Sequence, residues 1–115
     1  MMRRGEVWLI RLDPTVGAEI RKTRPVIIVS SDEIGVLPLR VIVPLTNWRD
    51  HHAQAPWMIR IEPDSQNGLD KPSAADAFQV RCVAEGRFLR RLGTMSDHTM
   101  ADLAEALAVV FEIET

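Results

Sequence analysis

The spacing of apolar residues changes only once along this sequence, and that change limits the chain to one fold class. From residue 6 to residue 84 the apolar residues form short alternating or unbroken runs, separated by Gly, Pro, Asn and Asp. Only at the C-terminus do they recur every three or four residues, at Met100, Leu103, Ala104, Leu107, Val110 and Phe111. No helical stretch separates the strand-like runs, so we expect no βαβ units. The sequence predicts a small, curled antiparallel sheet or barrel with one C-terminal helix.

The pattern predicts five strands, over residues 6–12, 25–30, 39–46, 58–62 and 77–84. Pro44 is expected to force a bulge or an edge position near the end of the third strand. Residues 63–73 have the composition of turns, and residues 87–92 are expected to form a short helical turn. The C-terminal helix should have about four turns, with Ser96 as its N-cap and Asp97 in its first turn.

Length and charge limit what this chain can bind. With 115 residues we expect a single domain over residues 1–115, large enough for a real core. The formal net charge is -2, but it is unevenly spread. Residues 1–30 carry six basic and three acidic side chains, whereas residues 95–115 carry five acidic ones and no Lys or Arg. Local potential steers a ligand, so this acidic average does not exclude a polyanion site.

The single cysteine, Cys82, excludes an internal disulfide and a four-cysteine zinc site. On an apolar strand face it is expected to be buried and inert, in a reducing compartment. The first apolar run, residues 7–10, is too short for a signal peptide, and no run approaches the length of a membrane span. We therefore expect a cytoplasmic protein that does not contact a membrane.

Common catalytic motifs are absent. The sequence has no P-loop, HExxH, paired CxxC or GxGxxG. The tripeptide Asp50-His51-His52 matches the letters of a phosphoesterase signature, yet such an enzyme needs further ligands from distant motifs, and the only other histidine is His98. Metal ligation, a solvated loop and contact with RNA are the three alternatives for this tripeptide, and a solvated loop is favoured. Trp48 and Trp57 lie on either side of the same region. They could have a structural role, or their rings could stack on RNA bases.

Six blocks of sequence, taken together, closely resemble the MazF/PemK family of toxin endoribonucleases. They are RGEVW at 4–8, DPTVGAEIRKTRPV at 13–26, VPLT at 43–46, GLDKPS at 68–73, QVR at 79–81 and RRLG at 90–93. Any one block alone would be a weak signal. Their order and spacing are specific, and they extend over nearly the whole chain.

The resemblance implies an SH3-like barrel of the CcdB/MazF type that forms a homodimer. It implies a sequence-specific endoribonuclease that cuts single-stranded RNA, mRNA above all, without a metal or another cofactor. The expected products have 2′,3′-cyclic phosphate and 5′-hydroxyl ends. A cognate, MazE-like antitoxin is expected to inhibit the enzyme, and an acidic, flexible segment of that partner would suit the net charge of +3 on residues 1–30.

The resemblance also carries roles to individual residues. Arg24 and Thr46 match the catalytic positions, and Glu19 matches a supporting position. Residues expected to bind RNA are Lys22, Thr23, Asn47, Gln79 and Arg81. The long connection between the first two strands is expected to form a loop over the site, and Asp13, Pro14 and Gly17 are the residues of that loop expected to lie there.

The chemistry of these residue types agrees with that assignment. RNA carries its own nucleophile, the 2′-hydroxyl, so an enzyme needs only to move protons and to stabilise an anionic phosphorane. The forked guanidinium of Arg24 suits phosphate oxygens, and the Thr46 hydroxyl can donate to the same centre. Arginine is a poor base because of its high pKa. Glu19 is one candidate base, and His51 or His52 is a weaker one.

Other interpretations remain. Arg24 could form only a structural ion pair with Asp13 or Glu19, and Thr46 could only cap a strand end. Ala18 stands where the family commonly has serine, and residues 47–54 have no recognisable motif, so the RNA sequence that is read stays open. A gyrase poison of the CcdB type on the same barrel would act through the C-terminus, but the terminal Trp-Gly-Ile of such proteins is missing. A degenerate paralogue that only binds an antitoxin is the third alternative.

Overall fold

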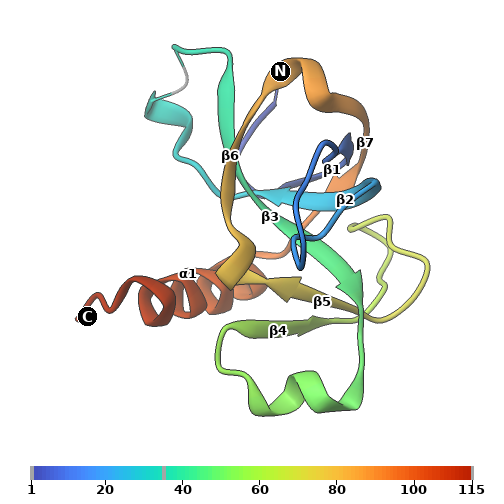
Figure 1. Cartoon of the computed structure of the whole chain (residues 1–115), viewed down its shortest axis with the longest axis vertical. Helices are drawn as coiled ribbons and strands as arrows, with labels where there is room; N and C mark the ends of the chain where they lie inside the picture. Colours follow the sequence, from blue (N-terminus) through green and yellow to red (C-terminus); the bar gives the residue numbers. More distant parts are fainter. Residues whose placement is uncertain (1, 35, 115) are drawn as a thin grey trace.

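The computed structural model describes residues 2–34 and 36–114, and in these residues strands dominate up to the single C-terminal α-helix (Figure 1). The strands are β1 (Glu6–Arg11), β2 (Thr23–Ile28), β3 (Leu39–Asn47), β4 (Met58–Ile61), β5 (Ser73–Asp76), β6 (Arg81–Ala84) and β7 (Phe88–Thr94). Short 3-10 turns lie between them: η1 (Asp32–Ile34), η2 (Asp50–Gln54), η3 (Ala77–Gln79) and η4 (Glu85–Arg87). The helix is α1 (Asp97–Phe111).

All strand pairs are antiparallel, in the order β4-β5-β3-β2-β1-β7, with β6 pairing to β3. The sheet is strongly curled but not closed, because none of the ladders among the described residues joins β7 to β4 or to β6. The fold is therefore mainly β with a C-terminal helix, as predicted, while the barrel is incomplete. No helix within residues 2–34 and 36–114 is long and apolar enough to cross a membrane.

Strand β3 occupies the centre of the fold and changes partner along its length. Residues 39–42 pair with β6, whereas residues 45–47 pair with β5, on the same side of the strand. Pro44, expected to mark a bulge or an edge, lies instead at this change of partner, inside the β2–β3 ladder opposite Val26. A proline is tolerated there because its missing N–H falls where neither ladder needs a donor.

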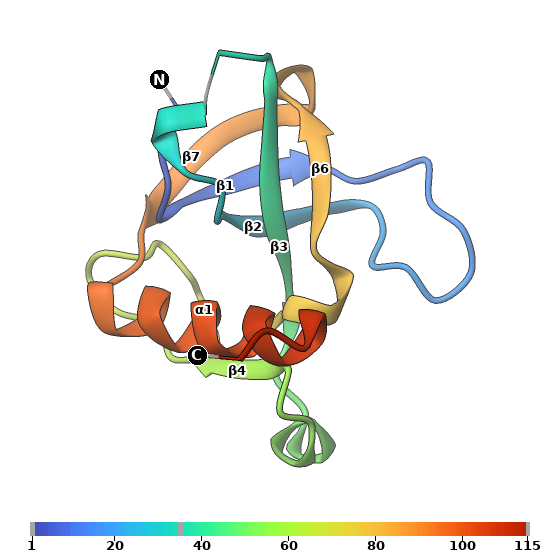
Figure 2. The ribbon, with the colours of Figure 1, turned by 90° about the vertical axis from the view of Figure 1, so that its left-hand side faces the viewer.

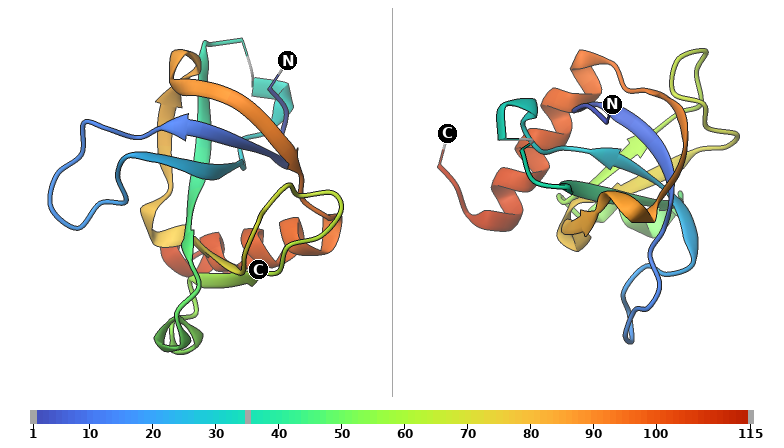
Figure 3. Two further views of the ribbon diagram at one scale, coloured as in Figure 1. Left: turned by 90° about the vertical axis from the view of Figure 1, so that its right-hand side faces the viewer. Right: turned by 90° about the horizontal axis from the view of Figure 1, so that it is seen from above.

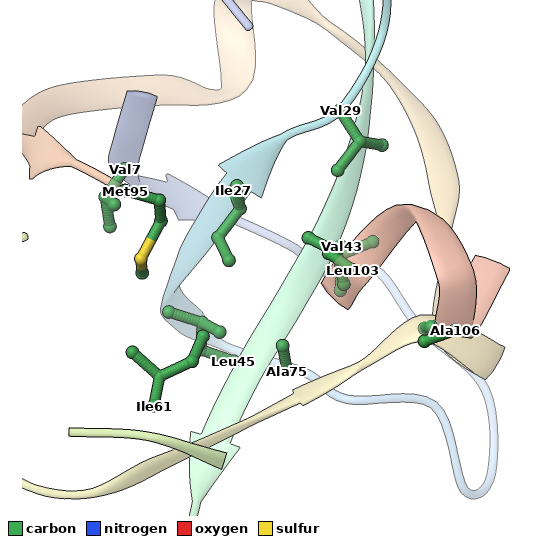
Figure 4. Close-up of a cluster of buried hydrophobic side chains, with 11 residues drawn as sticks. Val7, Ile27, Val29, Val43, Leu45, Ile61, Ala75, Met95, Leu103 and Ala106 are labelled. Atoms are coloured by element: carbon green, nitrogen blue, oxygen red, sulfur yellow. The ribbon is translucent and has the colours of Figure 1, made fainter. Parts of the chain in front are cut away.

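Both faces of the curled sheet are buried, which explains the unbroken apolar run in β2. One cluster contains Ile27, Val43 and Leu45 from the sheet and Leu103 and Ala106 from α1 (Figure 4). The alternate residues of the same strands point to a second cluster that includes Ile10, Val26 and Ile42. Helix α1 crosses the end of the sheet beside β4 (Figure 2). The Ser96 side chain accepts the Thr99 N–H at 3.1 Å, which confirms the predicted N-cap.

The structure differs from the sequence-based expectations at four places in the second half of the sheet. Residues 77–79 form the 3-10 turn η3 and not the start of a strand, so only Arg81–Ala84 of the predicted fifth strand is extended. Within the predicted helical turn at 87–92, residues 88–92 belong to strand β7, and β5 was not predicted at all. Cys82 is exposed, because Val83 and not Cys82 faces the core.

Candidate active site

Arg24 and Thr46 come together where β2 and β3 separate. The β2–β3 ladder ends at the pair Val26–Pro44. Arg24 lies two residues before Val26 in β2, and Thr46 lies two residues after Pro44 in β3. Both are therefore just beyond the end of the ladder, on the same face as that last pair. Each is fixed from its other side, since Arg24 pairs with Ile10 of β1 and Thr46 pairs with Ala74 of β5. The two predicted catalytic residues therefore flank a gap between two firmly anchored strands.

A cavity of about 410 Å³ occupies this gap, and both Arg24 and Thr46 line it. Thr23 and Asn47, predicted to bind RNA, line it as well. The wall includes one acidic residue, Asp70, and four basic residues, Arg24, Lys71, Arg90 and Arg91. The cavity therefore carries a net positive charge in a chain whose formal net charge is -2. Such a site is suited to an anionic ligand.

The guanidinium of Arg24 is only partly engaged by the protein. Its Nε donates to the Arg21 carbonyl at 3.3 Å, and Arg24 forms no salt bridge within residues 2–34 and 36–114. The structural ion pair to Asp13 or Glu19, considered as an alternative, is therefore not formed. A guanidinium held through Nε keeps its terminal N–H groups for phosphate oxygens.

Sequence reasoning missed the basic residues Lys71, Arg90 and Arg91. All three belong to blocks that carry the family resemblance, but no role was assigned to them. Arg91 is braced by the buried Glu6 carboxylate at 3.5 Å and by the Thr94 hydroxyl at 2.7 Å. Reading residues 87–92 as a helical turn hid the fact that β7 forms one wall of the cavity.

Glu19 lies apart from this cavity. Its carboxylate accepts the Val16 N–H at 2.7 Å, inside the exposed loop between β1 and β2. It lines a second cavity of about 440 Å³, together with Pro44, Phe78, Gln79 and other residues. Neither Glu19 nor Gln79 is among the residues that line the Arg24–Thr46 cavity. The structure therefore brings together Arg24 and Thr46, but not Glu19.

The loop residues expected to lie over the site form local turns. Asp13 accepts the Thr15 hydroxyl at 3.0 Å, and Gly17 adopts a φ of 58°, in the left-handed region that glycine tolerates best. A hydrogen bond from the Lys22 backbone N–H is the main cause that lowers the pKa of Asp13 below its ordinary value. Figure 3 shows this loop projecting away from the sheet. Asp13, Pro14, Gly17 and Lys22 do not line the Arg24–Thr46 cavity.

The two other candidate bases are also outside the cavity. His51 and His52 lie in η2, with their rings 4.4 Å apart. Burial and the neighbouring His51 lower the pKa of His52, and its Nδ1 accepts the Arg49 N–H at 3.2 Å. Among the described residues, no group of three or more His, Cys, Asp or Glu is placed to hold a metal ion. The Trp48 ring packs edge-on against the His52 ring. The guanidinium of Arg60 lies over the Trp48 ring, with its Cζ 5.1 Å from the ring centroid.

Comparison with known proteins shows which family this sequence matches. Residues 3–111 match the sequence model of a family described as PemK-like, MazF-like toxin of type II toxin-antitoxin system. Endoribonuclease MazF9 of Mycobacterium tuberculosis is 33% identical over 119 residues, covering 98% of each chain. Endoribonuclease MazF of Staphylococcus saprophyticus is 33% identical over 115 residues, covering 100% of this chain and 95% of its own.

Solved structures have the same fold. MazF from Deinococcus radiodurans superposes with a TM-score of 0.79 at 18% identity, covering 97% of each chain. A mycobacterial endoribonuclease, solved in complex with its cognate antitoxin, superposes with a TM-score of 0.79 at 21% identity. That match covers 100% of this chain and 99% of the other. Sequence and fold comparisons thus point to the same group of proteins.

Proposed function

Because the chain belongs to the PemK-like, MazF-like family of type II toxins, we propose that it is an endoribonuclease that cuts single-stranded RNA at short sequences. The observation that carries this proposal is the basic cavity in the gap between β2 and β3, which both Arg24 and Thr46 line. A phosphodiester is anionic, and its cleavage needs donors aimed at the phosphorus centre.

The proposed reaction uses the RNA as its own nucleophile. The ribose 2′-oxygen forms a bond to the adjacent phosphorus while losing its proton to a base, and the bond from phosphorus to the 5′-oxygen breaks. The products are a 2′,3′-cyclic phosphate and a 5′-hydroxyl, which takes up a proton. Arg24 stabilises the negative charge of the phosphorane and donates toward the leaving 5′-oxygen, and the Thr46 hydroxyl donates to the same centre.

Glu19 remains the proposed supporting residue and candidate base. In this structure its carboxylate is bound to the Val16 N–H, outside the cavity, so its role as base stays a prediction. For RNA binding we propose Thr23 and Asn47 in the cavity wall, with Lys22 at the adjacent end of the loop. Lys71, Arg90 and Arg91 supply further positive charge to the same cavity. Contact of Gln79 and Arg81 with RNA stays a prediction from the resemblance.

We also propose the setting in which the enzyme acts. It is a single toxin domain over residues 1–115, works as a homodimer in the cytoplasm, and is inhibited by a cognate antitoxin through an acidic, flexible segment. A relative of the same fold has been solved with its cognate antitoxin, which supports a partner of that kind here. The gyrase-poison alternative has no observation in its favour.

The test is sequencing of the cut ends from mixed cellular RNA incubated with pure protein and EDTA. We expect new 5′-hydroxyl ends and 2′,3′-cyclic phosphates at one short recurring sequence. Absence of cutting by folded wild-type protein would contradict the proposed function. If the protein cuts RNA without EDTA but not at all with EDTA, the result would instead indicate metal ligation at His51 and His52.

A further inference from the structure

The loop between β1 and β2, residues 12–22, is held through its backbone by the side chain of Gln79. The Gln79 Oε1 accepts the Ile20 N–H at 2.5 Å, and its Nε2 donates to the Ala18 carbonyl at 3.3 Å. A carboxamide therefore binds the loop as one residue of a neighbouring strand would, with one acceptor and one donor. Both polar atoms of Gln79 are thus engaged by the loop, which leaves at most one N–H and one lone pair of the carboxamide for any other partner.

Two arginines of the same segment hold the root of the loop. Arg81 donates to the Leu12 carbonyl at 3.2 Å. Arg87 donates to the carbonyls of Arg11 and Asp13, at 3.2 and 2.7 Å. All these contacts reach backbone atoms, so residues 79–87 fix the path of the loop without depending on the loop's side chains. Figure 2 shows the loop leaving the sheet beside β6, on which Arg81 lies.

The path of the loop in turn sets the surroundings of Arg24. The Leu12 N–H donates to the Lys22 carbonyl at 2.8 Å, which closes the loop. At the end of the loop that leads into β2, the Arg21 carbonyl accepts a hydrogen bond from Arg24 Nε at 3.3 Å. Within the part of the chain that the structure describes, this is the hydrogen bond that orients the Arg24 side chain, and a change in the position of residues 18–22 would alter it.

We propose that Gln79, supported by Arg81 and Arg87, is a positioning residue that fixes the β1–β2 loop and, through Arg21, the guanidinium of Arg24. It acts on the rate of cleavage and not on the choice of bases. The effect on cleavage rests on the proposed function above, whereas the tether itself can be tested without RNA.

Limited proteolysis measures the tether directly. Arg21 and Lys22 are exposed trypsin sites within the loop, and the Arg24–Pro25 bond resists trypsin. In Gln79→Met, which keeps the length of the side chain but removes both hydrogen bonds, we expect the rate of cutting at Arg21 and Lys22 to rise about tenfold. Arg87→Met should raise the same rate. Gln66→Met, at an exposed glutamine remote from the loop, is the matched control and should leave the rate unchanged.

RNA cleavage then separates positioning from base reading. Gln79→Met should lower kcat about tenfold with KM within twofold, and the bases at the cut sites should stay the same. Gln79→Glu keeps the acceptor for Ile20 and should recover part of both the loop protection and kcat. Unchanged tryptic rates in Gln79→Met, or a changed base preference with intact loop protection, would overturn the proposal. If wild-type protein cuts no RNA, the proteolysis series still decides whether the tether exists.

Discussion

At Arg24 and Thr46, single substitutions can separate charge from geometry. Arg24→Ala removes both, and Arg24→Lys keeps the charge but loses the forked donors that match phosphate oxygens. We expect Arg24→Ala and Thr46→Ala each to lower the cleavage rate by about 10² or more, as the loss of one transition-state donor does. Arg24→Lys should fall between wild type and Arg24→Ala. The measurement is single-turnover cleavage of a synthetic RNA containing the preferred site.

The same variants need a control for folding, because Thr46 pairs with β5 and Arg24 with β1. Their midpoints of urea unfolding should stay close to that of wild type, since neither side chain belongs to a buried cluster. Cleavage by Arg24→Ala at the wild-type rate would remove Arg24 from the mechanism.

Asp76 gives a prediction about pH at the residue scale. The residue is only 6% exposed, and burial raises the pKa of its carboxyl above the ordinary 3.8. Hydrogen bonds from Phe78 and Gln79 and the nearby His52 act in the opposite direction and lower this pKa, but the effect of burial is larger. A raised pKa means that folding favours the protonated form. The stability from this group is therefore present at low pH and lost as the pH rises through the folded-state pKa, above 3.8.

Asp76→Asn mimics the protonated form at every pH. Urea unfolding between about pH 4 and pH 7 should show wild type losing stability relative to Asp76→Asn as the pH rises. Glu105→Gln, at an exposed helix position without a salt bridge among the described residues, is the control for general charge effects. A difference between wild type and Asp76→Asn that does not change with pH would show that Asp76 keeps an ordinary pKa.

At the scale of elements, two glycines allow the loop 62–72 to pack against β7 and complete the cavity wall. A Cβ on Gly68 would lie 2.1 Å from the Leu92 carbonyl oxygen, and one on Gly93 would lie 2.2 Å from that of Gln66. Gly68 also has a φ of 71°. Because the obstacles are backbone atoms, Gly68→Ala and Gly93→Ala should each lower the free energy of unfolding by about 2–4 kcal/mol.

Gly86→Ala provides the control for this pair. A Cβ at Gly86 would meet nothing within 4 Å, and its φ is not in the left-handed region. Its free energy of unfolding should stay within about 0.5 kcal/mol of wild type. Equal stability for all three alanine variants would mean that the loop and β7 separate easily, and that the cavity wall is not rigid.

The elements that sequence reasoning missed share a physical cause. The residues of β5, Ser73–Asp76, are small or acidic and have low strand propensity, yet they are all buried because the strand lies between β3 and β4. In β7, register shifts against β1 interrupt the alternation of side chains, so Phe88, Leu89 and Leu92 imitate a helical spacing. Where the apolar residues alternate or form a continuous β-branched run, as in β1, β2 and β3, the sequence predicted the strands closely.

The candidate site divides in the same way. Arg24 and Thr46 could be placed from the sequence because both belong to well-ordered strands and to specific family blocks. Lys71, Arg90 and Arg91 could not, because their orientation depends on β7 and its adjoining loop. The partners of Gln79 lie about sixty residues away in sequence, at Ala18 and Ile20, and depend on a tertiary contact that no local pattern reports.

At the scale of the whole molecule, charge is separated between the site and the rest of the surface. The chain has a formal net charge of -2, and α1 carries acidic residues without Lys or Arg. The cavity wall nevertheless combines Arg24, Lys71, Arg90 and Arg91 with Asp70 alone. RNA should therefore be attracted to one region of the protein and repelled elsewhere, which favours a defined binding path over a general coating.

Salt dependence of binding tests this separation. A 2′-O-methyl oligonucleotide lacks the nucleophile and measures binding alone. If about three phosphates are neutralised, the slope of log K against log salt should be about -2, so that binding weakens roughly fifteenfold between about 50 and 200 mM salt. Arg90→Gln should make the slope shallower by about 0.7, since one contact is lost. Arg3→Gln, at an exposed position outside the cavity, should leave it unchanged. A slope near zero, or equal slopes for Arg90→Gln and wild type, would mean that RNA does not use this basic wall, because each phosphate that a protein cation neutralises releases a counterion.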